Sequence, residues 1–411
     1  MDDIYVRKMA QKKHRIAYFH QDGLITGSAI SLRHFLNALD LNRFEPVVIL
    51  AKEGAARELY ENLGIAVYVY PYTAFWTFPG PRCFSRGMLK QLPSILPNSG
   101  LRRFILNDIR PNLIHINDKA AMQVGITMRN SGIPIIQHSR SSYHNVNCPL
   151  TKFISRTFIQ NYSKEIIAIS EDEIDGFESV KNLSIINNTV DFVLTDSARA
   201  KRSAIRASLG IKDNELLIGF AAAINSKKGA WTFLKLCNHL KNVSNVRFIL
   251  IGKASKTGHT LLDDGSILKI PCEQYMQQFI AKHGLDKHII VTGFRNDSLD
   301  LMAAMDLLIV PNKNGVLGRQ PIEAQALGIP VVAINGHTGN STVIDNGVTG
   351  LLVANENELI EQTEKLIENP IRLKQMSHKG IAYANQHFSP ELNIRKIETL
   401  YDKLLYEDTT A

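Results

Sequence analysis

The residues that could do chemistry are concentrated in the segment 307–353. An apolar run, 307–310, stops at Pro311, a glycine-containing loop follows, and Pro321 then favours the first turn of a helix. A loop between a strand and a helix N-terminus presents unpaired N–H groups, which suit a phosphate. Glu323, one turn inside the helix, can accept two hydrogen bonds from a vicinal diol such as a ribose. The segment therefore predicts a site for a phosphate and a ribose.

The elements around this segment alternate between β-branched runs and helical patterns. Such alternation indicates parallel sheets covered by helices on both faces. The chain of 411 residues is long enough for two domains of about 150–200 residues each. The expected strands are 15–20, 46–51, 65–70, 113–116, 133–137, 166–169, 216–222, 247–252, 289–292, 307–310 and 330–334.

Four ordered motifs resemble the donor-binding segment of retaining glycosyltransferases of the family 4 type, which belong to the glycosyl transferases group 1. The motifs are Gly318, Glu323-Ala324, GIPVV at 328–332 and NGVTGL at 346–351. The resemblance covers nearly the whole chain and implies the α/β GT-B architecture, with two facing Rossmann-like domains, parallel sheets and a cleft between them. The alternative is an ordinary α/β unit in which Glu323 is only a first-turn helix carboxylate.

The resemblance also implies the domain limits. We expect an N-terminal Rossmann-like acceptor-binding domain at 1–190 and a C-terminal Rossmann-like domain for the nucleotide-sugar donor at 191–388. The segment 389–411 would form a C-terminal helix that crosses back to the first domain.

Donor-binding residues follow from the same resemblance. Lys228, before a helix, matches the family lysine that binds the donor phosphates and could stabilise a departing nucleoside diphosphate; the alternative is a solvated surface lysine. Gly27 would approach the diphosphate, unless its turn is a plain tight turn. Gly293, Phe294 and Arg295 resemble the turn beside the nucleotide base. The loop before Glu323 would complete the donor site with Asn314, Gly315, Val316, Leu317, Gly318 and Arg319.

Catalytic and acceptor residues are expected at strand ends in the first domain. His138 follows a strand at the edge where ligands approach open α/β sheets, and the family histidine at such a position contacts the transferred sugar. Taken alone, a histidine after a strand is more often structural. Asn117, Asp118 and Arg140 are candidates for acceptor binding, although Asp118 could equally cap a helix. No Asp-x-Asp pair or histidine-cysteine cluster suggests a metal site, and we expect no cofactor.

Three positions depart from the family pattern. Gly315 and Thr342 stand where the family has glutamates, and Ala223 stands where it has an arginine. Loss of charge-assisted contacts of about 1.5–3 kcal/mol each could change the donor or disable transfer. Arg319 or Arg140 could supply the missing cation.

Composition limits the class of protein and its location. The hydrophobic content of 45% and charged content of 21% exclude wholesale disorder. Four cysteines without paired or metal-like spacing suggest reduced thiols. No apolar run reaches the roughly 18 residues that span a bilayer, and the N-terminus lacks a signal-peptide core. We therefore expect a cytoplasmic protein, with peripheral contact to the inner face of the membrane.

Charge is unevenly distributed along the chain. Twelve Lys or Arg and two acidic residues lie between Arg82 and Lys164, whereas the whole chain carries +8. Such a field implies an anionic partner, with an anionic membrane surface as one candidate. The same region holds Tyr72, Phe75, Trp76 and Phe78, which would lie either in a membrane interface or in an acceptor pocket or local core.

The leading hypothesis is a retaining, metal-independent glycosyltransferase. It would move a sugar from a nucleotide-diphosphate donor, with a UDP-sugar as the first expectation, to a glycan or lipid-linked acceptor in bacterial surface polysaccharide or glycolipid assembly. One alternative is a nucleotide-sugar epimerase of the same architecture. Another is a degenerate, non-catalytic partner subunit, which the three departures favour. No nucleic-acid partner is expected, because no helix-turn-helix or aromatic RNA-binding signature is present.

Overall fold

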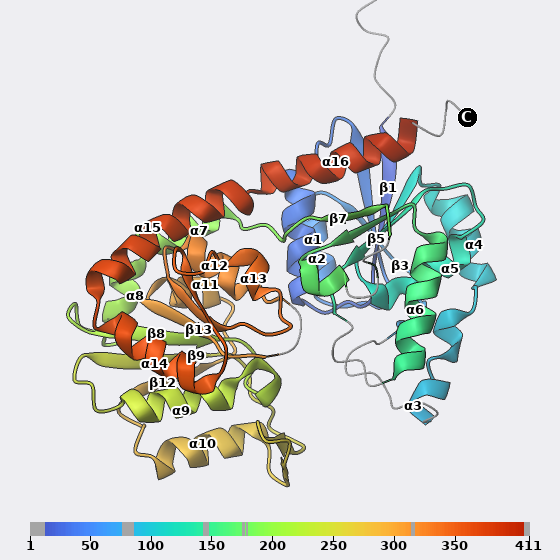
Figure 1. Ribbon diagram of the computed structural model, residues 1–411. Coiled ribbons are helices and arrows are strands. Elements are labelled where there is room, and N and C mark those ends of the chain that lie inside the picture. Colours follow the sequence, from blue (N-terminus) through green and yellow to red (C-terminus); the bar gives the residue numbers. More distant parts are fainter. Residues whose placement is uncertain are drawn as a thin grey trace, which may run out of the picture. The chain divides into compact units, whose positions relative to one another are not determined.

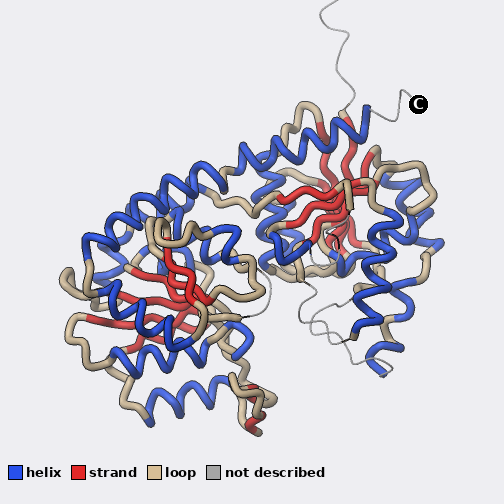
Figure 2. Tube along the Cα trace, viewed as in Figure 1, coloured by secondary structure: helices blue, strands red, loops and turns tan. Residues whose placement is uncertain are grey.

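The computed structural model describes residues 13–75, 86–142, 148–174, 177, 180–313 and 317–406. Two compact units divide the chain. Met1–Asn188 and Pro390–Ala411 form the first unit, and Thr189–Ser389 form the second. Each unit is built on one parallel sheet between helices (Figures 1 and 2).

The first unit contains a seven-stranded sheet in the order β3-β2-β1-β4-β5-β6-β7, and all its strand pairs are parallel. In chain order β1 to β7 are His14–His20, Phe44–Leu50, Ala66–Val69, Leu113–Ile116, Ile135–Ser139, Glu165–Ala168 and Leu183–Ile185. The helical segments are α1 (Gly27–Ala38), α2 (Ala56–Glu61), α3 (Arg86–Leu89), η2 (Leu92–Ile95), α4 (Ser99–Arg103), η3 (Phe104–Ile109), η4 (Lys119–Ala121), α5 (Met122–Met128), α6 (Pro149–Tyr162), η5 (Glu171–Ile174) and α16 (Pro390–Tyr406).

Alternate residues of β1 show how the first sheet is covered on both faces. Ala17 and Phe19 belong to the apolar cluster that also contains residues of α4, α5 and α6. Ile16 and Tyr18 belong to the opposite cluster, with residues of α1, α2 and α16. Side chains of a strand point alternately to its two faces, so both clusters form on one strand.

Helix α16 packs on the first unit beside α1 (Figure 1). Ile394, Ile397 and Tyr401 are buried in the cluster with Tyr18. Glu398 accepts a hydrogen bond from the backbone N–H of Asp40 at 2.9 Å. Buried apolar side chains therefore form the contact area between α16 and the first unit, and polar pairs fix the position of the helix along this contact.

The second unit contains a six-stranded parallel sheet in the order β12-β9-β8-β13-β14-β15 and a small antiparallel pair, β10-β11. In chain order β8 to β15 are Leu216–Ala221, Val246–Ile251, Thr260–Leu261, Ile267–Leu268, Ile289–Gly293, Leu307–Val310, Val331–Ile334 and Gly350–Val353. The helical segments are α7 (Phe192–Ala200), α8 (Arg202–Ser208), η6 (Ser226–Lys228), α9 (Ala230–Leu240), α10 (Cys272–Lys282), α11 (Ser298–Ala303), α12 (Gln320–Ala326), α13 (Asn340–Val343), α14 (Glu356–Ile367) and α15 (Pro370–His387).

Strand order creates a switch point in each sheet. In the first sheet the strands that follow β1 lie on one side of it, and the strands that follow β4 lie on the opposite side. In the second sheet β8 and β13 are neighbours of the same kind, with β9 beside β8 and β14 beside β13. Loops that leave the carboxyl ends of two such strands diverge, which opens a space for ligands. The prediction of two Rossmann-like parallel sheets is confirmed. Strands β7 and β15 and the β10-β11 pair were not anticipated, because short strands carry little pattern.

The structure also bears on the expectations for the cysteines and for membrane-spanning helices. Cys237 and Cys272 are buried free thiols, but Cys148 is disulfide-bonded, so the expectation of four reduced thiols is wrong at Cys148. Spacing along the chain does not limit which sulfur atoms a fold brings together. Within the described ranges, no helix has both the length and the apolar character needed to cross a membrane.

A polar cluster fixes the start of β13. Asp306 accepts hydrogen bonds from Arg206 Nη1 at 2.9 Å, Arg202 Nη2 at 2.5 Å and the backbone N–H of Leu217 at 2.7 Å. Arg206 is buried, and it also donates to the Ala304 carbonyl at 2.8 Å. The cluster thereby joins α8, β8 and the strand that leads into the segment at 311–319.

We expect Asp306→Asn to lower the free energy of unfolding by about 3 kcal/mol, because it leaves a buried guanidinium without its counter-charge. Chemical denaturation of the purified protein measures this loss. Asp297→Asn is the matched control, because Asp297 also pairs with an arginine, Arg295, but on the surface; its midpoint should barely move. Equal small shifts in both variants would contradict a structural role for Asp306.

Candidate functional site

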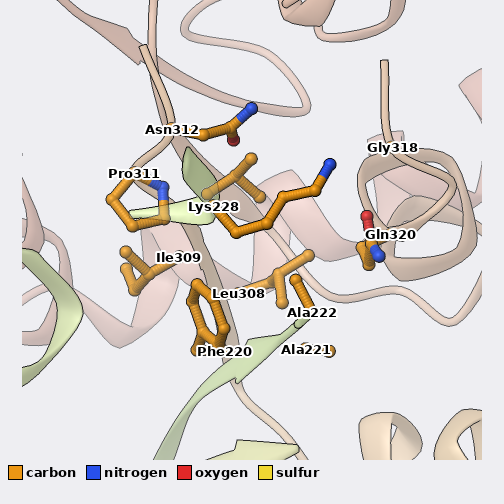
Figure 3. A pocket seen from close by; sticks show the side chains of 11 residues that line it. Phe220, Ala221, Ala222, Lys228, Leu308, Ile309, Pro311, Asn312, Gly318 and Gln320 are labelled. Carbon is orange, nitrogen blue, oxygen red and sulfur yellow. The ribbon is translucent and has the colours of Figure 1, made fainter. Parts of the chain in front are cut away.

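A hollow lies at the switch point of the second sheet, where β8 and β13 end (Figure 3). Its wall contains residues from the ends of both strands and from the loop that leads into α12. Lys228 also lines it. The lining residues are Phe220, Ala221, Ala222, Lys228, Leu308, Ile309, Val310, Pro311, Asn312, Gly318 and Gln320.

Lys228 is placed by its local turn. The side-chain oxygen of Asn225 accepts a hydrogen bond from the Lys228 backbone N–H at 3.1 Å and so caps η6. The ammonium group makes no hydrogen bond or ion pair with any residue that the structure describes. Burial lowers the pKa of Lys228 because charge is disfavoured away from water. An anion in this hollow would relieve that cost, so the site is complementary to a phosphate.

Gly229 allows the Lys228 turn to approach the end of β13. Its φ is +76°, a left-handed conformation that favours glycine. A Cβ atom at this position would lie 2.7 Å from the carbonyl carbon of Pro311. A side chain at residue 229 would therefore push apart the two segments that line the hollow.

Glu323 and Arg319 form an ion pair one helical turn apart. Arg319 Nε donates to Glu323 Oε1 at 2.9 Å, and Arg319 Nη2 donates to the Thr189 carbonyl at 3.2 Å. Arg319 is buried, while Glu323 is partly exposed. The guanidinium that was expected to supply a missing cation is directed at Glu323, so it orients this carboxylate.

The other predicted donor residues lie in different settings. Leu317 is buried, Gly318 lines the hollow, and Asn314, Gly315 and Val316 lie outside the described residues. Gly293 ends β12 with φ +69°, and Phe294 after it is largely exposed. Arg295 pairs with Asp297 at 2.6 Å. Gly27 begins α1, and a Cβ there would meet no atom within 4 Å.

Arg140 is the centre of a second cluster, at the strand ends of the first unit. It is buried, and its guanidinium donates hydrogen bonds to the side chains of Asn117, Asn188 and His138. Nε donates to Asn117 Oδ1 at 2.9 Å, Nη1 to Asn188 Oδ1 at 2.6 Å, and Nη2 to His138 Nδ1 at 3.4 Å. The structure thus brings together three residues that the sequence singled out separately, His138, Asn117 and Arg140, at the ends of β4 and β5.

Asn117 and Asp118 both have partners within the first unit. The amide nitrogen of Asn117 lies 3.0 Å from His20 Nδ1 and 3.3 Å from the Ser28 carbonyl. Asp118 caps η4, since its Oδ1 accepts from the Ala120 N–H at 3.0 Å. Burial raises the pKa of Asp118. The structure thus shows the helix-capping alternative, and contact with an acceptor stays a prediction.

His138 is buried and neutral. Burial holds its pKa well below the usual value, and the positive charge of Arg140 lowers it further. Nε2 of His138 has no hydrogen-bond partner within the described part of the chain. An N–H at this atom would be free to donate to a ligand.

His20 was not selected from the sequence. It ends β1 and lies next to Asn117, at the switch point of the first sheet. Burial lowers its pKa to about 3, with a further contribution from Arg140. The strand-end rule that selected His138 applies equally to His20 and could have found it. Among the described residues, no three His, Cys, Asp or Glu side chains form a group suited to a metal ion.

We expect Gly229→Ala to destabilise the protein by about 2–3 kcal/mol, because it combines left-handed backbone strain with the contact against Pro311. Gly210→Ala is the matched control. Gly210 also has a positive φ, +68°, but a Cβ there meets nothing within 4 Å, so only strain remains, at about 1 kcal/mol. Thermal unfolding measures both, and equal losses would show that the close approach is unimportant.

The chain is similar to known proteins in sequence and in fold. Residues 201–383 match the family model described as Glycosyl transferases group 1. The D-inositol 3-phosphate glycosyltransferase of Rhodococcus jostii is 26% identical over 304 residues, which cover 68% of this chain and 64% of that protein. The lipopolysaccharide core biosynthesis mannosyltransferase of Rhizobium meliloti is 28% identical over 136 residues, or 32% of this chain and 39% of that protein. The chain thus spans less than two thirds of the length of these curated relatives.

A solved structure extends the similarity to nearly the whole chain. Anabaena HepE in complex with UDP-glucose superposes with a TM-score of 0.74 at 22% identity, covering 94% of this chain and 99% of that one. Sucrose-phosphate synthase of Thermosynechococcus elongatus gives 0.72 at 16% identity, covering 96% and 100%. The chain therefore has the GT-B fold, and its residues 201–383 match the model of the glycosyl transferases group 1 family.

Proposed function

We propose that this protein is a retaining, metal-independent glycosyltransferase that moves a sugar from a nucleotide-diphosphate donor to a hydroxyl group of an acceptor. The observation that carries the proposal is the ammonium of Lys228, which has no partner among the described residues and lies in a hollow at the switch point of the second sheet. Similarity to a structure that holds UDP-glucose supports a UDP-sugar as the first donor to test. Similarity to the two named glycosyltransferases supports sugar transfer.

The second unit would bind the donor. Lys228 and the backbone at Gly318 would face the diphosphate, and Glu323, oriented by Arg319, would accept hydrogen bonds from the ribose. Residues 293–295 would border the base, and Asn314, Gly315, Val316 and Leu317 would complete the loop. From the first unit, Gly27 has the open space that close approach to a diphosphate requires.

The reaction would proceed by front-side attack. The acceptor oxygen would form a bond to the anomeric carbon on the face from which the diphosphate oxygen departs. The acceptor proton would pass to an oxygen of the leaving diphosphate, so the proton and electron pair balance without a covalent enzyme intermediate. Lys228 would stabilise the negative charge that develops on the leaving group. His138 would donate a hydrogen bond from Nε2 to a hydroxyl of the transferred sugar.

The first unit would bind the acceptor. Asn117, Asp118 and Arg140 remain the proposed acceptor residues, with Arg140 also holding His138 in place. The lipopolysaccharide core biosynthesis mannosyltransferase relative favours a glycan or lipid-linked acceptor of surface polysaccharide or glycolipid assembly. An epimerase or a non-catalytic partner subunit would not release nucleoside diphosphate in an acceptor-dependent manner, which separates them from a transferase.

We expect the purified protein to release nucleoside diphosphate from one member of a panel of UDP-, GDP-, dTDP- and ADP-sugars, with and without chelator. Lys228→Ala should lower kcat/KM on the order of a hundredfold, because it removes the charge that stabilises the leaving group. Lys227→Ala is the matched control, since Lys227 is the exposed neighbour in η6. Glu323→Ala should weaken donor binding.

Three results of this assay would contradict parts of the proposal. Loss of release on chelation would exclude a metal-independent reaction. Equal effects of the two lysine variants would remove Lys228 from the reaction. Absence of detectable binding to every donor in the panel would favour the non-catalytic partner.

We also propose that part of the basic segment 82–164 lies against the anionic inner face of the cell membrane. Segments α3–η2 and α6 expose large apolar side chains beside cations, and they share an apolar hollow that includes Leu92 and Ile154. Tyr72 and Phe75 instead lie in the local core, and Trp76 and Phe78 lie outside the described residues. The proposed membrane surface consists of Leu89, Leu92, Leu150 and Phe153, with Arg86, Lys90 and Lys152.

We expect Phe153→Asp to reduce binding to phosphatidylglycerol vesicles about thirtyfold, because insertion of a phenylalanine ring contributes about 2 kcal/mol. Phe153 is 68% exposed, and Val193 in α7 of the second unit is 80% exposed. Val193→Asp therefore adds the same charge at an exposed apolar position outside the proposed surface. Vesicle co-sedimentation measures binding, and the surface is wrong if both variants bind like the unmodified protein, or if phosphatidylcholine vesicles bind equally well.

A further inference from the structure

Asn312 is a buried polar side chain without a partner. It lies two residues beyond the end of β13 and lines the hollow together with Lys228 and Gln320 (Figure 3). The residue is 6% exposed, and its amide makes no hydrogen bond to any residue that the structure describes. Most buried polar side chains have a hydrogen-bond partner, and one without a partner lowers stability. The chain therefore keeps an unfavourable group at a place where a ligand could satisfy it.

The backbone that carries Asn312 is held from both sides. On one side Gly229 lies against Pro311. On the other side Gly336, in the loop after β14, lies against Lys313, and a Cβ atom at residue 336 would overlap the Lys313 carbonyl group. Two loops thus pack closely on the segment 311–313. This packing fixes the path of the segment and keeps the Asn312 side chain at the hollow.

The neutral amide preserves the charge of the hollow. Lys228 is the only charged side chain among the described residues that line it. In Figure 3 the Lys228 side chain reaches into the space between Asn312 and Gln320. Aspartate has almost the same shape as asparagine, but at residue 312 its carboxylate would compensate the ammonium charge. With asparagine at this position, the hollow stays positive.

A phosphate group matches both side chains. Its oxygens are hydrogen-bond acceptors, whereas an ammonium group can only donate and the nitrogen of an amide offers two donors. An anion held by Lys228 therefore meets the nitrogen end of the Asn312 amide. Binding would satisfy the buried amide and offset the cost of the partly buried ammonium together. Gln320 has less need of a ligand, because it is partly exposed and water can reach its amide.

We propose that Asn312 is a further binding residue of the hollow, and that its amide N–H donates to a phosphate oxygen of the diphosphate that Lys228 holds. The neutrality of Asn312 keeps the charge of Lys228 available to the anion. The identity of the anion as a nucleoside diphosphate rests on the proposed transferase function. The preference for an anion rests on the hollow itself.

The test compares Asn312→Asp with Asn312→Ala in the full chain. Isothermal titration calorimetry with UDP, GDP, dTDP and ADP first identifies the nucleoside diphosphate that the wild type binds. For that nucleotide, Asn312→Ala should weaken binding about tenfold, because one hydrogen bond to a charged group is lost. Asn312→Asp should weaken it by about a hundredfold or more, because the carboxylate pairs with Lys228 and repels the phosphates.

Thermal unfolding without ligand gives a readout that does not depend on activity. Asn312→Asp should raise the midpoint by about 2–4 °C, because it supplies a counter-charge to Lys228. A gain in stability with a loss of binding cannot come from general damage to the fold. Asn245→Asp is the matched control, since it adds the same charge at an exposed asparagine directly before β9, at the opposite edge of the sheet. It should change neither quantity.

Several results would overturn the proposal. They are wild-type affinity in Asn312→Asp, an unfolding midpoint that does not rise in this variant, and a wild type that binds none of the four nucleotides. If Asn312→Asp does not fold, Asn312→Ala decides, and unchanged affinity overturns the proposal.

The same measurements separate this proposal from the proposed function. If the wild type binds a nucleoside diphosphate with the expected losses in the variants but releases none from any sugar donor, the transferase function fails and the role of Asn312 stands. If the wild type releases nucleoside diphosphate while Asn312→Asp binds it equally well, only the role of Asn312 fails.

Discussion

The guanidinium of Arg140 is the interaction on which the first unit's cluster depends. It bonds to side chains at the end of β4, at the end of β5 and after β7, so one buried cation fixes three segments. Burial lowers the pKa of the surrounding imidazoles, and the charge of Arg140 lowers it further. Lys228 in the second unit differs, because it is held by its backbone turn and its ammonium has no partner among the described residues.

Much of the fold could be predicted from the sequence because buried parallel strands are continuous β-branched runs. The predicted bounds of the strands Leu113–Ile116 and Leu307–Val310 are those of the structure. The bounds of the other predicted strands differ from the structure by one or two residues. His138 could be selected because it follows a strand at the edge where ligands approach, and Lys228 could be selected because it matches the family lysine before a helix. The Arg319–Glu323 pair could also have been predicted, since the residues are four apart on one helix, but each had been given a separate role.

The rest of the candidate site could not be predicted, because its members are distant in sequence. His115 Nε2 lies 3.2 Å from His138 Nδ1, and its Nδ1 lies 2.7 Å from the hydroxyl of Tyr401, which is 286 positions away. Neither His115 nor Tyr401 belongs to a motif. Asn188 reaches Arg140 across 48 positions. Such contacts arise from tertiary packing of α16 and β7, which local patterns do not encode. Ala223 and Thr342 differ from the family pattern, and the effect of these differences depends on contacts with the donor. Gly315 lies outside the described residues.

The position of α16 has a consequence for how the protein is made. Residues 189–389 of the second unit lie between the strands of the first unit and the helix that completes its core. During synthesis, the second unit therefore emerges in full while Tyr18 and Ile16 still lack their partners from Ile394, Ile397 and Tyr401. The nascent first unit then has an uncovered apolar face, and the contact between His115 and Tyr401 forms only after translation has passed residue 401. For this chain, the middle of the sequence can fold before its beginning is finished.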